Sequence, residues 1–202
     1  MKKVYSLLAT FGIVSLLTGC EPQGSLFPLF TNDDKAYEKQ LLGTWKVMAG
    51  NDGHTDPSLN VGMVEFSPRK DENSYDMKIP KFTDAGGTLV STAHLVRLGA
   101  YLFIDLAKPE LDLDKAPEIP FPSIEGHCFG RLVLSGDTAR IDFLNDEWVS
   151  KQIDAGKLKL AYLQTSDITL LSANTPELRK FALEHAEDHA AFSQSYTLTR
   201  NK

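Results

Sequence analysis

The sequence predicts a mainly β protein, folded as an antiparallel barrel or sandwich, and three observations support this prediction. Short segments of alternating apolar and polar residues recur along the chain, turn-forming residues separate them, and two of the turns begin with glycine. The 202 residues, 42% of them hydrophobic, suffice for one core. The expected strands are 42–48, 62–67, 75–79, 88–98, 101–106, 129–134, 139–144, 158–163, 168–171 and 196–200.

The amino-terminal segment has the pattern of a secretion signal. Two lysines precede an apolar stretch from Val4 to Leu17, which is shorter than a spanning helix of about 20 residues and has no positively charged stop after it. The ending Leu17-Thr18-Gly19-Cys20 resembles the lipobox of bacterial lipoproteins. This resemblance implies removal of the signal peptide 1–19, lipid attachment at Cys20 and an acyl-anchored amino terminus.

The residues after the cysteine predict the location and the start of the folded domain. Glu21 stands where an aspartate marks lipoproteins for inner-membrane retention, so we expect the outer membrane, with the protein on its periplasmic face. Segment 20–36 holds two prolines, a glycine and apolar residues without a period, which predicts a flexible tether. A single barrel domain is expected over 37–202.

Two hairpins can be placed in register from their turns. Gly99-Ala100 and Gly136-Asp137 each put glycine first in a two-residue connection, which favours type II′ turns. The second turn sets Arg131 opposite Asp142, so that opposite charges meet across the strands.

Two helices are expected in the second half of the chain. Asp146 would cap a short helix running through Ala155, with Gly156 just after its end. Thr175 would cap a second helix, with Pro176 at its first position. Side chains at helical spacing then continue the second helix: Leu178, Phe181, Ala182, His185, His189 and Phe192.

The first strand of the domain carries a recognisable motif. Gly43-Thr44-Trp45 resembles the Gly-x-Trp motif of lipocalins and other calycins, and the domain size, the meander of short strands and the helix before the last strand are also similar. The resemblance implies a calycin-like β-barrel with an arginine of the final strand packed over the tryptophan. Arg200 is the residue in that position, and its guanidinium would stack on the indole of Trp45.

A second similarity covers 94–98, 102–106 and 174–188. These stretches look like a group of uncharacterised bacterial secreted proteins, and this likeness implies no activity.

Composition excludes several classes of protein. The net charge of −6 argues against a nucleic-acid partner, because phosphate binding needs clustered lysine and arginine. Two cysteines without a CxxC pair exclude a zinc ribbon and a thioredoxin-like redox motif. We expect no cofactor.

The connection 107–126 is the most informative loop. It contains four prolines and five acidic residues, and a loop of this length inside a compact domain is either functional or disordered. It could form a lid over the barrel mouth or a mobile insertion, and the sequence favours neither.

Four residues form a candidate polar or ligand site. The turn at Gly99-Ala100 sets His94 opposite Asp105, where the carboxylate would orient and charge the imidazole. A structural pair is favoured over a catalytic base, because no nucleophile is placed beside it. Cys128, next to His127, alternates with inward-facing residues, which favours a buried filler over a reactive thiol.

His185 and His189 are candidate metal ligands, since residues four apart share a helical face. The intervening residues match neither HExxH nor its inversion, and both imidazoles lie on the apolar stripe. Histidines that line the core or a cleft are therefore favoured, and no metal is expected.

These observations predict a lipid-anchored periplasmic lipoprotein that binds a small apolar or amphipathic ligand inside a barrel. The alternative is an accessory module of an envelope complex, with a solid core and a protein partner. A hydrolase or metal-dependent enzyme is a third possibility, and we expect a protein that is not an enzyme.

Overall fold

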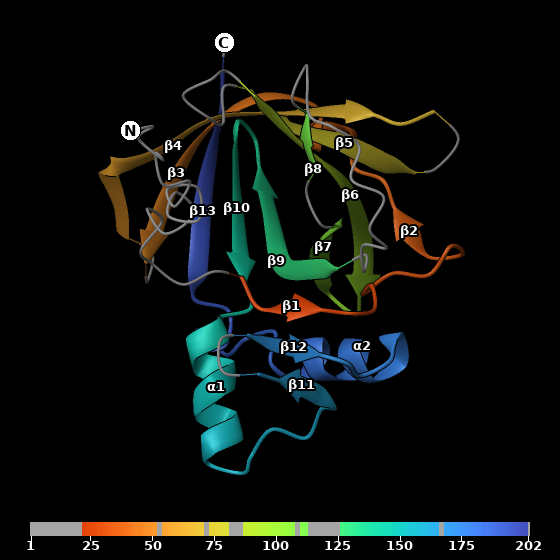
Figure 1. Cartoon of the computed structure of the whole chain (residues 1–202). Helices are drawn as coiled ribbons and strands as arrows, with labels where there is room; N and C mark the ends of the chain where they lie inside the picture. Colours follow the sequence, from red (N-terminus) through yellow and green to blue (C-terminus); the bar gives the residue numbers. More distant parts are fainter. Residues whose placement is uncertain are drawn as a thin grey trace, which may run out of the picture.

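A computed structural model describes residues 22–51, 54–70, 73–80, 87–107, 110–112, 126–165 and 168–201. A closed antiparallel β-barrel forms the upper part of the molecule in Figure 1, and two helices with a small hairpin lie beneath it. The predicted mainly β fold with a barrel is therefore confirmed.

Eight strands close the barrel. Each pairs antiparallel with its neighbours in the order β10-β13-β3-β4-β5-β6-β7-β9, and β9 pairs with β10 to complete the ring. Of the ten expected strands, the two at 158–163 and 168–171 stay outside the ring and form a separate hairpin. The barrel strands are β3 (Gly43–Asn51), β4 (His54–Pro68), β5 (Ser74–Ile79), β6 (Thr88–Leu98), β7 (Tyr101–Ala107), β9 (His127–Ser135), β10 (Thr138–Phe143) and β13 (Gln194–Arg200).

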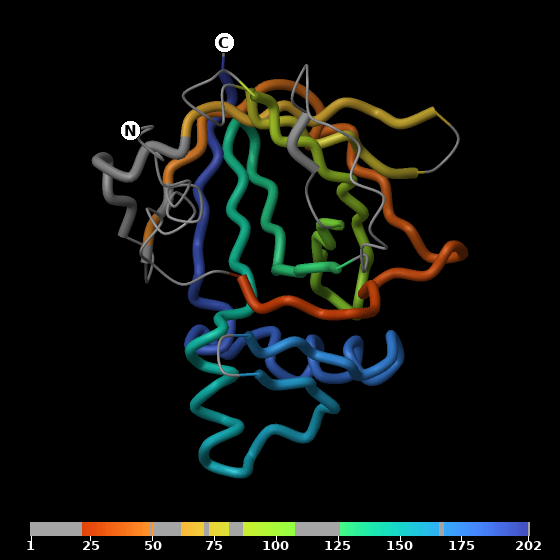
Figure 2. The backbone as a smooth tube through the Cα atoms, viewed as in Figure 1, coloured from red at the N-terminus to blue at the C-terminus, as the bar shows by residue number. Residues whose placement is uncertain are grey.

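Short strands add to the ring at its margins. β2 (Lys35–Ala36) and β8 (Glu110–Asp112) pair with β6. β1 (Gly24–Ser25) pairs with the first residues of β9 on one side and, in parallel, with β12 (Thr169–Leu171) on the other. β12 pairs with β11 (Tyr162–Gln164). Figure 2 shows the amino-terminal segment, in red, running between the barrel and the helical unit.

Residues 22–36 differ from the expected flexible tether, because they pack against the barrel. The Leu29 side chain is fully buried, and its amide donates a hydrogen bond to Asp105 on β7. Arg179 donates to the Leu29 carbonyl and forms an ion pair with Asp34. Leu29 is buried by tertiary contacts, which a local pattern does not reveal. Cys20 and the signal segment lie outside the described residues.

Both hairpin turns have the predicted register. Arg131 lies opposite Asp142 and His94 opposite Asp105. Gly99 and Gly136 both have φ of 57°, as the first position of a type II′ turn requires. Their successors Ala100 and Asp137 do not have a positive φ, because Asn73 is the one described non-glycine residue that does. Asp142 is fully buried and accepts hydrogen bonds from Arg131, Arg140 and Ser195, so it joins two neighbouring strands of the barrel wall.

Both helices form, and in each the capping residue lies one position before the predicted cap. α1 (Asp146–Asp154) is capped by Asn145, whose side chain accepts from the Trp148 amide, and Gly156 follows its end with φ of 64°. α2 (Thr175–Glu184) is capped by Asn174 in a capping box with Glu177. The Thr175 hydroxyl instead donates to the Pro28 carbonyl. Within the described residues, neither helix is long and apolar enough to cross a bilayer.

Two apolar clusters lie on opposite sides of the barrel wall. The first fills the barrel interior around Trp45 and Phe66. The second lies outside, where Phe103 and Phe129 of the wall pack against Phe192, with ring centroids 5.9 and 6.4 Å apart. The helices therefore cover the outer face of β6, β7 and β9.

The connections between strands leave the barrel at alternate ends, because neighbouring strands are antiparallel. The turns after β4, β6 and β9 lie at one end of the barrel, which also holds the first residue of β3, Gly43, and the last residue of β13, Arg200. The connections after β3, β5 and β7 leave at the other end. The predicted loop 107–126 belongs to this second group; 110–112 form β8, and residues 108–109 and 113–125 lie outside the described residues.

Candidate functional site

Trp45 and Arg200, the predicted pair, close one end of the barrel and are called the indole clamp here. They are register partners on β3 and β13, and the Arg200 guanidinium carbon lies 4.1 Å from the ring centroid of Trp45. Arg200 also donates to the carbonyls of Leu42 and Gln40, at 2.8 and 2.6 Å. The fully buried indole donates to the Leu41 carbonyl at 2.8 Å. The clamp thus ties the last strand to the segment before the first barrel strand.

Gly43 makes room for this clamp. Its φ of 112° lies in a region that other residues rarely adopt. A Cβ atom there would lie 2.9 Å from Nη1 of Arg200. Glycine in the Gly-x-Trp motif is therefore required by backbone conformation and by the space that the guanidinium occupies.

The inward-facing side chains differ between the two halves of the barrel. Near the clamp, Trp45, Phe66 and Tyr75 have 0–2% of their surface exposed. Toward the other end, four inward-facing side chains from four strands contact the interior cluster yet remain partly exposed. This second half is called the cup, and its partly exposed side chains are Ile79, Leu106, Cys128 and Tyr196.

Cys128 is part of the cup wall and not a reactive centre. It faces inward in alternation with Gly130 and Leu132, as the sequence predicts. Burial raises the pKa of its thiol to about 12, and the nearby Asp105 carboxylate acts in the same direction. The thiol is therefore protonated at neutral pH and is a poor nucleophile.

Asp105 lies on the outer face of the barrel, where the amino-terminal segment covers it. The predicted contact with His94 does not form, although the two residues are register partners. Instead, Oδ1 of Asp105 lies 2.8 Å from Nδ1 of His127, and Oδ2 accepts from the Leu29 amide at 2.6 Å. Asp105 is fully buried, and its contacts hold the amino-terminal segment on the barrel.

His94 is buried beside this pair without a partner for its Nδ1 atom. Its ring stacks on Phe30, with centroids 3.8 Å apart. Burial lowers its pKa to about 4, and the positive charges of Lys35 and Arg69, with His127, act in the same direction. The neutral, stacked ring is a packing element of the covered wall, and Asp105 does not charge it as the sequence suggests.

The two metal-ligand candidates do not share a helical face, because α2 ends at Glu184. His185 is the capping residue and packs against Phe181 and Trp148, with ring centroids 4.6 and 5.1 Å apart. His189 is exposed beyond the helix. In the part of the chain that the structure describes, no three His, Cys, Asp or Glu side chains gather as a metal site would require.

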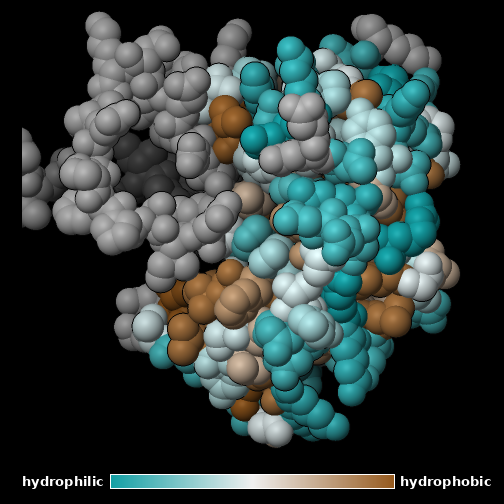
Figure 3. All heavy atoms as spheres, turned by 90° about the vertical axis from the view of Figure 1, so that its right-hand side faces the viewer, coloured by the Kyte–Doolittle hydropathy of each residue, from teal (hydrophilic) through white to brown (hydrophobic). Residues whose placement is uncertain are grey.

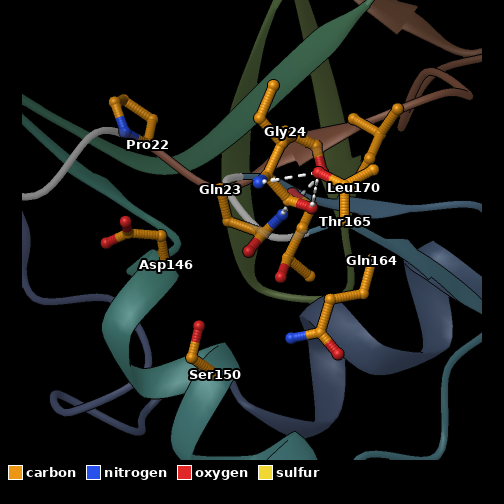
Figure 4. Close-up of a pocket in the computed structure, with 10 residues that line it drawn as sticks. Pro22, Gln23, Gly24, Asp146, Ser150, Gln164, Thr165 and Leu170 are labelled. Atoms are coloured by element: carbon orange, nitrogen blue, oxygen red, sulfur yellow. Dashed lines mark hydrogen bonds between the residues drawn. The ribbon is translucent and has the colours of Figure 1, made fainter.

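A pocket lies where β1, α1 and the hairpin of β11 and β12 meet, and no sequence pattern points to it. Its volume is about 400 Å³, and it is open to solvent on one side. Figure 4 shows Asp146 and Ser150 of α1 across from Gln164, with Gly24 and Leu170 above them in this view. Its residues come from segments far apart in the chain, so only the fold assembles it.

Comparisons of this chain with protein-family models, with curated proteins and with solved structures find no match. Inferences about function therefore come from the sequence and the geometry.

Proposed function

We propose that this protein is a lipid-anchored lipoprotein at the periplasmic face of the outer membrane, and that its barrel binds a small apolar or amphipathic ligand in the cup. One observation carries the ligand-binding proposal: the buried Trp45 under Arg200 closes one end of the barrel, whereas four inward-facing side chains toward the other end remain partly exposed. Partly exposed apolar side chains inside a barrel with one closed end suit contact with a small apolar molecule.

We place the entrance for the ligand in the cup half of the barrel. The cup lies at the end from which the chain leaves after β3, β5 and β7, opposite the clamp. Three of the four partly exposed cup residues are small or aliphatic, and the hydroxyl of the fourth, Tyr196, accepts from the Gln194 side-chain amide at 3.3 Å. The lining therefore favours a ligand that is largely apolar with few polar groups. The lipobox ending at Cys20 supports the anchoring.

Titration of the purified, delipidated protein with the fluorescent probe N-phenyl-1-naphthylamine tests the binding site. We expect a saturable fluorescence increase that Cys128→Phe weakens by about tenfold or more, because a phenyl ring would fill the cup. The matched control is Val133→Phe, which adds the same ring to an outward-facing position of β9 that is 48% exposed. The control variant should bind the probe as the unaltered protein does.

Two results would overturn the proposal. Equal probe binding by both variants would place the bound probe outside the cup. No probe binding, together with no small molecule retained in native mass spectrometry of protein from its own envelope, would favour the accessory module with a solid core. The same mass spectrum measures acylation at Cys20 directly.

A further inference from the structure

The inner face of the barrel wall continues beyond the ring through the small strands. Cross-strand partners in a sheet point to the same side. Leu106 pairs with Cys128, Cys128 with Gly24, Gly24 with Leu170, and Leu170 with Leu163. These five residues, one from each of β7, β9, β1, β12 and β11, form a single apolar row.

The apolar row leads from the cup to the outside of the molecule. Leu106, Cys128 and Leu170 are partly exposed, and Leu163 at the far end has 56% of its surface exposed. Gly24 has no side chain, and Cδ1 of Leu170 lies 3.0 Å from the position that a Cβ atom of residue 24 would occupy. Four gaps between neighbouring strands give the row a length of roughly 19 Å.

The far end of the row is the most exposed apolar part of the described chain. Ile168, 66% exposed, alternates with Thr169 and therefore lies on the same face of the hairpin as Leu170 and Leu163. Figure 3 shows hydrophobic surface on the lower part of the molecule, where the helices and this hairpin lie. The exposed Lys157 and Lys159 precede the hairpin and suit an anionic headgroup surface.

The start of the described chain lies beside this hairpin. Pro22 lines the same pocket as Ile168 and Leu170, and its backbone bridges to Asn145 before α1. The two-residue link between Cys20 and Pro22 spans at most about 7 Å when fully extended. A lipid attached at Cys20 would bring the bilayer surface to the hairpin.

We infer that the hairpin of β11 and β12 rests on the bilayer through Leu163 and Ile168, and that the apolar row guides an apolar ligand between this bilayer and the cup. The inference builds on the proposed anchoring and ligand binding. In this inference the membrane is the source of the ligand. The exposed apolar hairpin then serves as the contact with the bilayer.

The contact is tested with the acylated chain, purified in detergent and reconstituted in vesicles of phosphatidylcholine with a minority of phosphatidylglycerol. A Leu163→Cys variant carries an environment-sensitive maleimide fluorophore; the high pKa of Cys128 keeps that thiol unlabelled. The matched control is Gln164→Cys, the next residue, on the opposite face of the strand. Spin-labelled lipids should quench the fluorophore at 163 strongly and the one at 164 weakly. Equal quenching at both positions, or none at either, would overturn the bilayer contact.

Transfer of N-phenyl-1-naphthylamine from the same vesicles to the protein tests the row. Leu163→Asp with Ile168→Asp should slow transfer by about tenfold, because charge opposes contact with the bilayer. Probe affinity measured without vesicles should stay unchanged, which also shows that this variant folds. A Gln164→Asp control should transfer normally. Unchanged transfer in the double variant would overturn the guiding function.

These outcomes are distinct from failure of the proposed function. An unmodified Cys20 in the mass spectrum would refute anchoring alone, and loss of probe binding in solution would refute the cup. Normal acylation and normal probe affinity, with the fluorophore at position 163 remaining in water, would refute only the hairpin contact.

Discussion

The two halves of the barrel interior are built differently. At the indole clamp, Trp45, Phe66 and Tyr75 are buried, the tryptophan is covered by a guanidinium, and hydrogen bonds tie Arg200 to two carbonyls. In the cup, four inward-facing side chains remain partly exposed. We therefore expect stability to depend mostly on the clamp half, and the proposed binding would use the other half. Three substitutions test this division, and a fourth tests the covered outer wall.

The largest loss of stability is expected for Trp45→Ala. Removing a fully buried aromatic ring should lower the free energy of unfolding by about 3–5 kcal/mol, measured by urea denaturation. Val133→Ala, at an exposed outward position, should change it by less than about 0.5 kcal/mol. A Trp45→Ala protein as stable as this control would show that the clamp does not carry the fold.

Arg200→Met should lower the free energy of unfolding by about 2 kcal/mol, because it removes the cation–π contact and two hydrogen bonds to carbonyls. Arg200→Lys keeps the charge and loses the planar fork, so its loss should be intermediate. If the lysine variant and the unaltered protein have the same free energy of unfolding in urea denaturation, the positive charge alone accounts for the stabilisation by Arg200.

Leu106→Ala compares the cup directly with the closed half. We expect a loss of only about 1 kcal/mol, because Leu106 is partly exposed and its removal leaves no closed cavity. Leu95→Ala, on the neighbouring strand and fully buried in the same cluster, should cost about 2–5 kcal/mol. Equal losses in thermal and urea unfolding would remove the distinction between the halves.

The last prediction concerns the pH dependence of stability caused by His94. Its pKa falls from 6.5 in the unfolded chain to about 4 in the folded protein. The unfolded state therefore binds more protons between these values, so the stabilisation is complete above pH 6.5 and is lost as the pH falls toward 4. His94→Phe, which keeps a ring against Phe30, should show a shallower fall in Tm over that range. Parallel curves of Tm against pH for the two proteins would show that His94 does not cause the pH dependence.

Much of the barrel follows from local signals in the sequence. Alternation placed the barrel strands, and glycine-first turns fixed the register of Arg131 with Asp142 because a two-residue turn permits one pairing. The Gly-x-Trp motif predicted the contact between Trp45 and Arg200, which the structure confirms. Local patterns cannot tell which strands close the ring, so the hairpin of β11 and β12 was counted among the barrel strands.

The candidate sites depended on contacts between distant segments, which spacing does not encode. Asp105 bonds to His127 rather than His94, because the carboxylate is also engaged by the Leu29 amide of a segment that the sequence suggested was a tether. The end of α2 at Glu184 separates His185 from His189. The apolar row needs the parallel pairing of β1 with β12, and no periodic pattern in the chain predicts that pairing.

The last strand is the final piece of the ring, and this has a consequence for how the protein is made. β13 fills the gap between β3 and β10, which lie at the beginning and in the middle of the domain. A chain synthesised from its amino terminus cannot complete its sheet until those last residues have emerged. A premature stop before Gln194 would leave two long rows of unpaired amides and carbonyls, and such a truncated product should aggregate rather than accumulate as a smaller soluble protein.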